Sequence, residues 1–448
     1  MSNPWDVIVV GARCSGATLA THLARSGVRT LLLEASPRGA DHPMSTHYVQ
    51  PPGIDALDRL GLGDRVRAVT PAARNIRLAL DDVEFLSAQP EGRFGRCVRR
   101  STLDPWLQEA AETAGAELRD RHRVVDVLRE GERVTGVVAE TASGKVELRA
   151  DLVVGADGPH SIVARRVGAE AYLEHTSDRG GYFFYVPAPP RWEHPWDATL
   201  EHRGEDIRYV FRCDGDVLCM ISVAPIREAQ SWGKNWRERT IAHLMASPTT
   251  ARLLEGKEPI GKGAGLLAPH FFYRRPVGPG WALVGDAGHF KDYVTGMGMT
   301  DAFEDAERLA RAIIDGRPGA FDVFWRERDA KSLPLHFDAL RQGAVGCNAP
   351  FFRWVIANMQ RDPELAKRPG LVSDRKLDPH EMIPVGRLLG WMGRAALRGR
   401  LDVLQGFFQQ GKVMGAERRE ITARRALHAE AVARLAAQAP RELATAAE

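Results

Sequence analysis

Apolar and polar positions at the start of the chain follow a strand, helix, strand pattern. Residues 6–10 form a short β-branched apolar run, residues 15–25 have the spacing of a helix, and residues 30–33 form a second apolar run. Gly27 stands where the helix must end. Further strand candidates lie at residues 123–128, 133–139 and 152–154. Strands that alternate with helices predict a parallel sheet covered by helices.

The pattern changes twice further along the chain. Residues 172–273 contain alternating, aromatic-rich strands, such as residues 182–186 and 217–221, which predict a separate mixed β-sheet. A buried strand and a helix between residues 281 and 314 then return the chain to the first domain. After residue 321 the spacing is mostly helical.

We therefore predict an α/β fold in three parts. A Rossmann-like nucleotide-binding domain, discontinuous in sequence, consists of residues 1–171 and 274–320. A mixed β-sheet domain for the substrate is inserted at residues 172–273, and residues 321–448 form a helical C-terminal region.

Composition narrows the possible partners. The 448 residues carry 61 basic and 58 acidic side chains, so the net charge of +3 indicates no nucleic-acid partner. The five cysteines show no zinc-ligand spacing, which predicts no metal site and favours a reducing compartment. The start of the chain lacks the pattern of a secretory signal, and no run reaches the roughly 18 apolar residues that a membrane span needs. We expect a cytoplasmic protein.

A glycine-containing turn lies between the first predicted strand and helix. Glycines here let the backbone approach a pyrophosphate at a helix N-terminus, and an acid after the next strand accepts hydrogen bonds from ribose. Arg13 replaces the middle glycine of the usual pattern, although a guanidinium can itself contact phosphate. The candidate nucleotide-binding residues are Gly11, Arg13, Cys14, Ser15, Gly16 and Glu34. The alternative is an ordinary tight turn before a helix.

Two later segments indicate which nucleotide binds. Residues 151–161 resemble the second signature of the flavoprotein aromatic hydroxylases, and residues 285–289 resemble their third. With three motifs in the family's order, the chain resembles the class A FAD-dependent monooxygenases of the para-hydroxybenzoate hydroxylase type. The wider group includes geranylgeranyl reductases and flavin halogenases. The resemblance implies FAD as the cofactor and NADPH or NADH as the electron donor.

The resemblance also implies roles for individual residues. Asp286 would hold the ribityl chain of FAD, and backbone N–H groups of residues 296–300 would lie beside the flavin ring. Asp157 and Gly158 would touch FAD and the nicotinamide donor, and Arg100 would approach the flavin. The cofactor-binding residues implied in this way are Arg100, Asp157, Gly158, Gly285, Asp286, Gly296, Gly298 and Met299.

Several candidate acids and bases lie near residues 296–300, which we call the ring-side segment. The chain departs from the family pattern at Tyr293 and Thr300, where Pro and Asn are usual. Asp292 and Tyr293, with Lys291 before them, would face the substrate side of the flavin and are candidates for proton transfer. His47 could titrate near neutrality and act as an acid or base. The alternatives are exposed loop residues and a histidine packed against the pocket wall.

The expected function is that of an FAD-dependent monooxygenase. NAD(P)H would reduce the flavin, and O₂ would deliver one oxygen atom to a small, aromatic or polyketide-like substrate. A reductase of the geranylgeranyl reductase type is the runner-up, and a flavin-binding sensor without turnover is the alternative from another class. A halogenase is disfavoured because residues 232–236 lack the W-x-W-x-I-P arrangement of that family.

Two further expectations concern the substrate pocket and the surface. Residues 182–185 would line the pocket or belong to a core. The basic amphipathic stretch at residues 387–400 could rest on a membrane, but such a stripe is more often a helix face packed on its own domain. Membrane contact is therefore not expected, and the sequence leaves the oligomeric state open.

Overall fold

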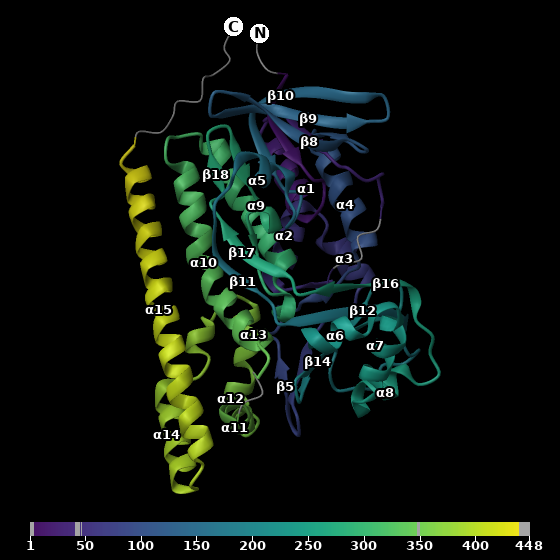
Figure 1. Cartoon of the computed structure of the whole chain (residues 1–448), viewed down its shortest axis with the longest axis vertical. Helices are drawn as coiled ribbons and strands as arrows, with labels where there is room; N and C mark the ends of the chain where they lie inside the picture. The colour runs from purple at the N-terminus through teal and green to yellow at the C-terminus, as the bar shows by residue number, and fades with distance from the viewer. Residues whose placement is uncertain (1–3, 41–44, 46, 347–349, 439–448) are drawn as a thin grey trace.

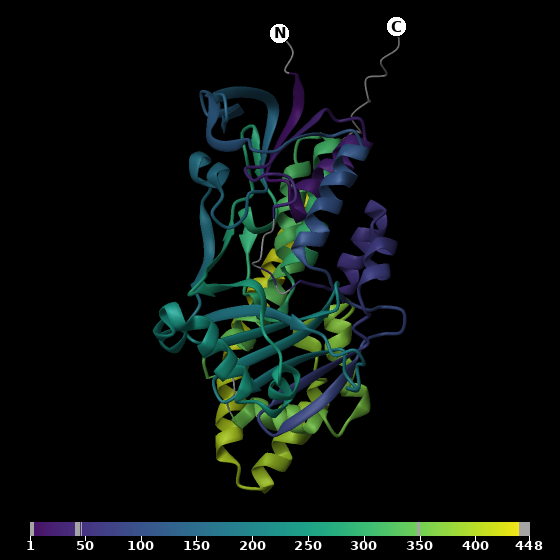
Figure 2. The same ribbon diagram turned by 90° about the vertical axis from the view of Figure 1, so that its right-hand side faces the viewer.

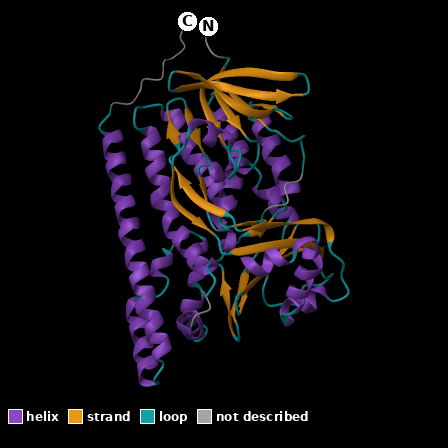
Figure 3. Ribbon diagram, viewed as in Figure 1, coloured by secondary structure: helices purple, strands orange, loops and turns teal. Residues whose placement is uncertain are grey.

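Two large sheets and a layer of long helices make up the molecule, as Figure 3 shows by colour. The computed structural model describes residues 4–40, 45, 47–346 and 350–438. None of the helices in these ranges is both long enough and apolar enough to cross a bilayer. The predicted α/β class, mixed sheets and helical C-terminal region are confirmed.

The first sheet is the predicted parallel sheet. Its strand order is β18 (Val277–Gly278), β19 (Trp281–Leu283), β10 (Gly144–Gly155), β1 (Trp5–Val10), β2 (Thr30–Leu33) and β7 (Glu117–Arg119). The strands from β19 to β7 run parallel, and only the edge strand β18 is antiparallel. The carboxyl ends of β1, β2, β10 and β19 therefore meet at one edge, where a doubly wound sheet binds its ligand.

Both faces of this sheet are covered, which explains the continuous apolar run of β1. Val7 and Val9 join a core with helices of one layer, while Ile8 and Val10 join a core on the opposite face. The helices of this part are α1 (Cys14–Arg25), α2 (Pro51–Leu60), α3 (Gly63–Val69), α4 (Arg100–Thr113), α5 (Ile162–Val167) and α9 (Gly298–Asp315). Strands β8 (Arg123–Glu130) and β9 (Arg133–Thr141) form an antiparallel ribbon with the first half of β10.

The second sheet is larger than the sequence pattern indicated. Its main order is β16 (Ile260–Leu267), β12 (Arg179–Pro187), β15 (Val217–Pro225), β14 (Asp206–Cys213), β13 (Ala198–Arg203), β4 (Asn75–Leu80) and β5 (Val83–Ala88). The short strand β6 (Arg96–Cys97) pairs with β14, and β3 (Tyr48–Val49) pairs with β6. The sheet thus draws strands from residues 48–97, which the predicted division assigned to the nucleotide-binding domain.

Smaller elements connect the two sheets. A three-stranded sheet consists of β11 (Ala171–Thr176), β17 (His270–Arg274) and β20 (His289–Phe290). Short helices α6 (Ile226–Ser231), α7 (Trp236–Met245) and α8 (Pro248–Leu254) border the second sheet. Single 3-10 turns occur at Gly233–Asn235, Gly285–Ala287, Tyr293–Thr295 and Pro379–Glu381.

The C-terminal helices line one side of the molecule (Figure 1). They are α10 (Ala320–Gly343), α11 (Pro350–Met359), α12 (Pro363–Ala366), α13 (Arg368–Ser373), α14 (Val385–Leu397) and α15 (Leu401–Ala436). The long helices α10 and α15 pack against each other. Helices α14 and α15 form a hairpin at the end of the molecule opposite the chain termini, and the turned view in Figure 2 places it there too.

Candidate cofactor and substrate site

The turn after β1 brings three backbone segments unusually close together. Gly11 has a φ of +102°, and a Cβ atom there would lie 2.5 Å from the carbonyl oxygen of Ala156. A Cβ on Gly16 would overlap the carbonyl oxygen of Gly11. Only glycine fits at both positions, because its backbone reaches conformations and approaches that a side chain blocks. This is the tight turn that the sequence predicted before the N-terminus of α1.

Glu34 is fixed at the end of β2 by backbone hydrogen bonds. Its Oε2 accepts from the N–H of Ala12 at 3.1 Å, and its Oε1 accepts from the N–H of Ser36 at 3.0 Å. A carboxylate retains further acceptor capacity after two such bonds, as a ribose would require. Among the described residues, the buried Nη1 of Arg13 has no hydrogen-bond partner, although Nε lies 3.8 Å from Glu34. An unpartnered guanidinium nitrogen beside the turn fits the phosphate of a dinucleotide.

The third motif packs directly on the first. Gly285 has a φ of +60°, and a Cβ atom there would lie 2.7 Å from the hydroxyl of Ser15. The carboxylate of Asp286 has no hydrogen-bond partner within the described part of the chain. Burial raises the pKa of Asp286 to about 6, and the positive charge of Arg100 opposes that shift. A partly buried carboxylate with free acceptors fits the hydroxyls of a ribityl chain.

Arg100 and Cys14 lie close enough to Asp286 to interact with it electrostatically. Arg100 is held at the start of α4 by a buried bidentate ion pair with Asp104, at 2.7 and 2.9 Å. The sulfur of Cys14 lies 3.8 Å from Asp104, and burial raises the pKa of this thiol to about 12. Cys14 therefore stays protonated and acts as a small packing residue rather than a nucleophile. The structure brings Cys14, Arg100 and Asp286 into one electrostatic cluster, although they lie far apart in sequence.

Asp157 and Gly158 of the second motif stabilise the turn that precedes α5. Asp157 Oδ2 accepts the N–H of Ile162 at 2.7 Å and fixes the start of α5, where Ser161 also caps Ala164 at 3.0 Å. Burial raises the pKa of Asp157. Gly158 has a φ of +80°, so the turn itself requires glycine. Contact of Asp157 and Gly158 with FAD or the nicotinamide donor stays a prediction.

The ring-side segment is tied to the stretch that contains His47. Gly296 has a φ of +62° and precedes α9, which begins at Gly298. The N–H of Gln50 donates to the hydroxyl of Thr300 at 3.1 Å, and its side-chain amide donates to the carbonyl of Thr295 at 3.3 Å. Met299 is buried beside them. Thr300, where the family pattern usually has Asn, thus joins the ring-side segment to the stretch that contains His47.

His47 does not titrate near neutrality. It is fully buried with a φ of +59°, and its Nε2 lies 2.5 Å from the hydroxyl of Tyr185. Burial lowers the pKa of His47 to about 3, and the positive charge of Arg100 lowers it further. The sequence expectation of a histidine that titrates at neutral pH is therefore wrong, because the imidazole is desolvated and lies near arginines. Its neutral ring forms a hydrogen-bonded pair with Tyr185.

Asp292 is buried and Tyr293 is half-buried, so neither is an exposed loop residue. Asp292 Oδ1 accepts the N–H of Val294 at 3.0 Å, and burial raises the pKa of Asp292 to about 7. Burial also raises the pKa of Tyr293, whose hydroxyl has no hydrogen-bond partner in the described ranges. Asp292 can therefore exchange a proton near neutral pH, while Tyr293 stays protonated. Their part in catalysis stays a prediction.

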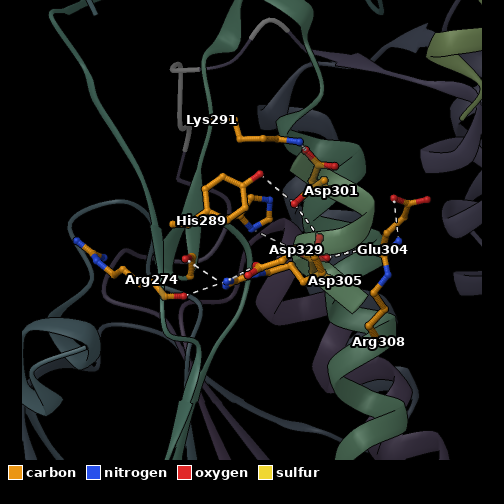
Figure 4. A network of polar contacts seen from close by, with 12 residues as sticks. Arg274, His289, Lys291, Asp301, Glu304, Asp305, Arg308 and Asp329 are labelled. Atoms are coloured by element: carbon orange, nitrogen blue, oxygen red, sulfur yellow. Dashed lines mark hydrogen bonds and ion pairs between the residues drawn. The ribbon is translucent and has the colours of Figure 1, made fainter. Parts of the chain in front are cut away.

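Lys291 forms a buried ion pair with helix α9. Its ammonium group lies 2.5 Å from Asp301 of α9, and both side chains are buried. Figure 4 shows this pair within a larger polar network in which His289 lies 3.2 Å from Asp305. Burial lowers the pKa of Lys291, and Asp301 opposes the shift. The charge of Lys291 is therefore paired with Asp301 of α9, and a part for Lys291 in proton transfer stays a prediction.

A cavity of about 370 Å³ adjoins the ring-side segment. Its walls come from the second sheet and the C-terminal helices, and they are mainly apolar. Residues of both walls include Ile76, Leu78, Leu200, Phe211, Phe351, Val355 and Leu388, and Thr295, Gly296 and Met297 close it at the ring-side segment. The volume lies at the lower end of the range for small-molecule sites, roughly 300–1,000 Å³.

The pattern of apolar residues in the sequence does not predict this cavity. Residues 182–185 do not line it. Tyr182 instead stacks on Trp232 and Trp236, with ring centroids 5.4 and 5.2 Å apart, and Phe184 lies in a separate core. The cavity walls come mainly from residues 76–89, 200–211 and 338–388, which only the tertiary fold brings together. Apolar side chains at those positions are indistinguishable from core residues in the sequence.

The fold and this site define the class of a dinucleotide-binding flavoprotein. The chain belongs to the FAD-binding domain family, whose model matches residues 4–319. This membership confirms the family resemblance inferred from the three motifs.

Similar proteins differ in their chemistry. Digeranylgeranylglycerophospholipid reductase 2 of Methanothermobacter thermautotrophicus is 33% identical over 347 residues, covering 73% of this chain and 85% of that protein. Kynurenine 3-monooxygenase of Flavobacterium johnsoniae is 25% identical, covering 70% and 73%. The structure of the flavin-dependent brominase Bmp2 matches with a TM-score of 0.72 and 20% identity, covering 90% of this chain and 99% of that one. This likeness concerns the fold alone.

Proposed function

We propose that this protein is a cytoplasmic FAD-dependent monooxygenase that takes electrons from NADPH or NADH. Its substrate is a small, largely apolar molecule, such as an aromatic or polyketide-like compound. The observation that carries the proposal is the position of the 370 Å³ cavity, which ends at Thr295, Gly296 and Met297. A substrate in that cavity would meet the segment that the family resemblance assigns to the flavin ring.

The chain's own residues bind, orient and exclude water. Arg13 and the glycine turn hold the phosphates, Glu34 holds the ribose, and Asp286 holds the ribityl chain. When bound, FAD supplies the redox and oxygen chemistry. The apolar walls keep water away from the reacting atoms, and Asp292 can take up or release a proton near pH 7.

A reductase that saturates a carbon–carbon double bond is the second candidate. It is favoured by the 33% identity to a digeranylgeranylglycerophospholipid reductase. The mainly apolar cavity would serve a prenyl substrate as well as an aromatic one. The two functions differ in the fate of oxygen, because only the monooxygenase places an oxygen atom in the product.

The experiment begins with the purified protein and its visible spectrum. Flavin absorbance that bleaches with NADPH or NADH under argon is expected, followed by a substrate screen under ¹⁸O₂. A product that contains one ¹⁸O atom supports the monooxygenase. A product that gains two hydrogens without ¹⁸O supports the reductase, and a flavin that neither nicotinamide reduces supports a sensor. Absence of flavin after reconstitution overturns all three.

A further inference from the structure

The helix hairpin formed by α14 and α15 carries an unusual apolar surface. Among the described residues, the five most exposed large hydrophobic side chains all lie between residues 385 and 408. They are Leu397 at 91% exposure, Leu401 at 75%, Phe408 at 66%, Val385 at 63% and Leu389 at 57%. We call this set the hairpin patch. Single exposed apolar residues are normal on a protein, but a group gathered on one projecting element marks an interaction surface.

The spacing along α14 shows that this surface is separate from the helix's packed face. Trp391, Met392 and Ala395 are buried and join a core with α11 and β5. Leu389 and Leu397 lie on a different arc, whereas Val385, seven residues before Met392, lies at the border between the open arc and the packed face. Helix α14 is therefore apolar on two sides. The described chain covers one side and leaves the other open, which corrects the expectation that the whole stripe packs on its own domain.

Basic side chains border the open arc. Residues 385–419 contain seven basic residues and two acidic ones. Arg387, Arg394 and Arg398 follow one another at spacings of seven and four, so they share a side of α14 next to the arc. All three are exposed, although Arg387 also lies 3.5 Å from Asp362 and Arg394 donates to Asn358 at 3.0 Å. The hairpin is thus locally cationic in a chain of nearly balanced charge.

The hairpin also forms part of the cavity wall. Val385 and Leu388 of α14 and Met414 of α15 line the cavity. Val385 is at the same time 63% exposed, so the cavity reaches the surface beside the hairpin patch. Figures 1 and 2 place this end of the molecule beyond the sheets, where no other element projects as far.

We propose that the hairpin patch docks on the surface of a bilayer that contains anionic phospholipid. The apolar side chains would enter the boundary between headgroups and acyl chains, and the arginines and Lys412 would face the headgroups. A second copy of the chain fits less well, because the cationic border of one copy would face that of the other. Docking in this orientation places the cavity mouth at the membrane. The delivery of a lipophilic substrate from the bilayer therefore rests on the proposed function, whereas docking does not.

Vesicle flotation of the full-length, flavin-loaded protein tests the docking. Binding to phosphatidylcholine vesicles that contain phosphatidylglycerol is expected, with affinity falling as salt rises. The double variant L397E/L401E should lose at least about tenfold in vesicle affinity, and R387Q/R398Q should lose the preference for phosphatidylglycerol. A matched control, I314E/V432E, adds the same two charges at residues with 43% exposure elsewhere and should bind like the wild type.

Several outcomes would overturn the docking. One is a wild type that floats with neither vesicle, and another is L397E/L401E that floats as well as the control. If sedimentation without vesicles shows that L397E/L401E splits an oligomer, the hairpin patch is an interface between copies instead. Flotation needs no substrate and no turnover, so a failure of docking is distinguishable from a failure of the monooxygenase proposal. Flavin content and thermal unfolding check that each variant is folded.

Discussion

The hydroxyl of Tyr185 lies 2.5 Å from Nε2 of His47, and the two rings stack with centroids 5.6 Å apart. The pair joins β12 of the second sheet to the residue just before β3, and Gln50, just after β3, donates to Thr300 near the start of α9. It thereby connects the sheet that forms the cavity to the ring-side segment. Because burial lowers the pKa of His47 to about 3, its imidazole is neutral at neutral pH.

We expect Tyr185→Phe to destabilise the protein without changing its pH profile. The substitution leaves the buried Nε2 of His47 without its partner, which costs about 1–2 kcal/mol. Thermal or urea unfolding of the flavin-loaded variant measures this loss. The pH dependence of kcat/KM should match the wild type between pH 5 and 9, roughly two units or more above the pKa of His47. A protonation step near pH 6.5 that vanishes in His47→Gln would contradict the assignment of a neutral imidazole.

Gly16→Ala should abolish FAD binding. The new methyl group would overlap the carbonyl oxygen of Gly11, and the backbone cannot move without opening the turn. A cost of roughly 3 kcal/mol in unfolding free energy is expected from such overpacking. Flavin absorbance after purification and Tm are the measurements. As a control, Gly411→Ala lies within α15 where nothing comes within 4 Å of the added methyl group, and it should keep FAD and gain about 0.5–1 kcal/mol.

The affinity for FAD should depend on pH through Asp286. Burial raises its pKa to about 6, and the ionised carboxylate is the better acceptor for ribityl hydroxyls. Affinity should therefore rise as pH increases through about 6, by up to about tenfold per unit below that value. Isothermal titration of the apoprotein with FAD at pH 5 to 8 measures the slope. Asp286→Asn should bind FAD more weakly at pH 8 and show a flat profile, and an unchanged slope in that variant would assign the titration to another group.

Asp292 should make the protein less stable as pH rises. Its folded pKa is about 7 and its ordinary value is 3.8, so the folded state holds more protons than the unfolded state between these values. Stability from this group is therefore present at low pH and is lost as pH increases toward 7. Asp292→Asn keeps an oxygen that can accept the N–H of Val294. The variant should be more stable than the wild type at pH 8, by up to roughly 4 kcal/mol, and equal to it near pH 4. Denaturation curves that differ by the same amount at both pH values would contradict the buried carboxyl.

The sequence predicted the parts of the site that depend on local backbone chemistry. Gly11, Gly16 and Glu34 are recognisable because a tight turn and an acid after the second strand occur within one β-α-β unit. The close packing of Gly285 on Ser15 was implied only through the family's motif order. Sequence could not show that His47 is neutral, since its pKa depends on burial and on arginines about 50 residues away in the chain.

The cavity lay beyond sequence reasoning for a related reason. Its walls combine β4 and β5 with α10, α11 and α14, and the parallel pairing of β4 with β13 joins segments more than 100 residues apart. Periodicity identifies an apolar face but does not say which faces oppose each other or leave space between them. The same limit applies to α14, whose two apolar sides read as one stripe in sequence although only one side is packed.

Filling the cavity should separate substrate binding from cofactor binding. Ser87 lies on β5 in the cavity wall, is buried and shares the face of Ile76, its partner on β4, so Ser87→Phe would project a ring into the 370 Å³ space. Flavin content and the rate of flavin reduction in the absence of substrate should stay unchanged, because Ser87 is not among the residues that the family resemblance assigns to FAD. The KM of a bulky substrate should rise by at least about tenfold, equivalent to 1.4 kcal/mol of lost binding. Ala426→Phe, at an exposed position of α15, is the matched control and should leave KM unchanged. If Ser87→Phe loses FAD but keeps its substrate affinity, the cavity belongs to the cofactor and the substrate enters elsewhere.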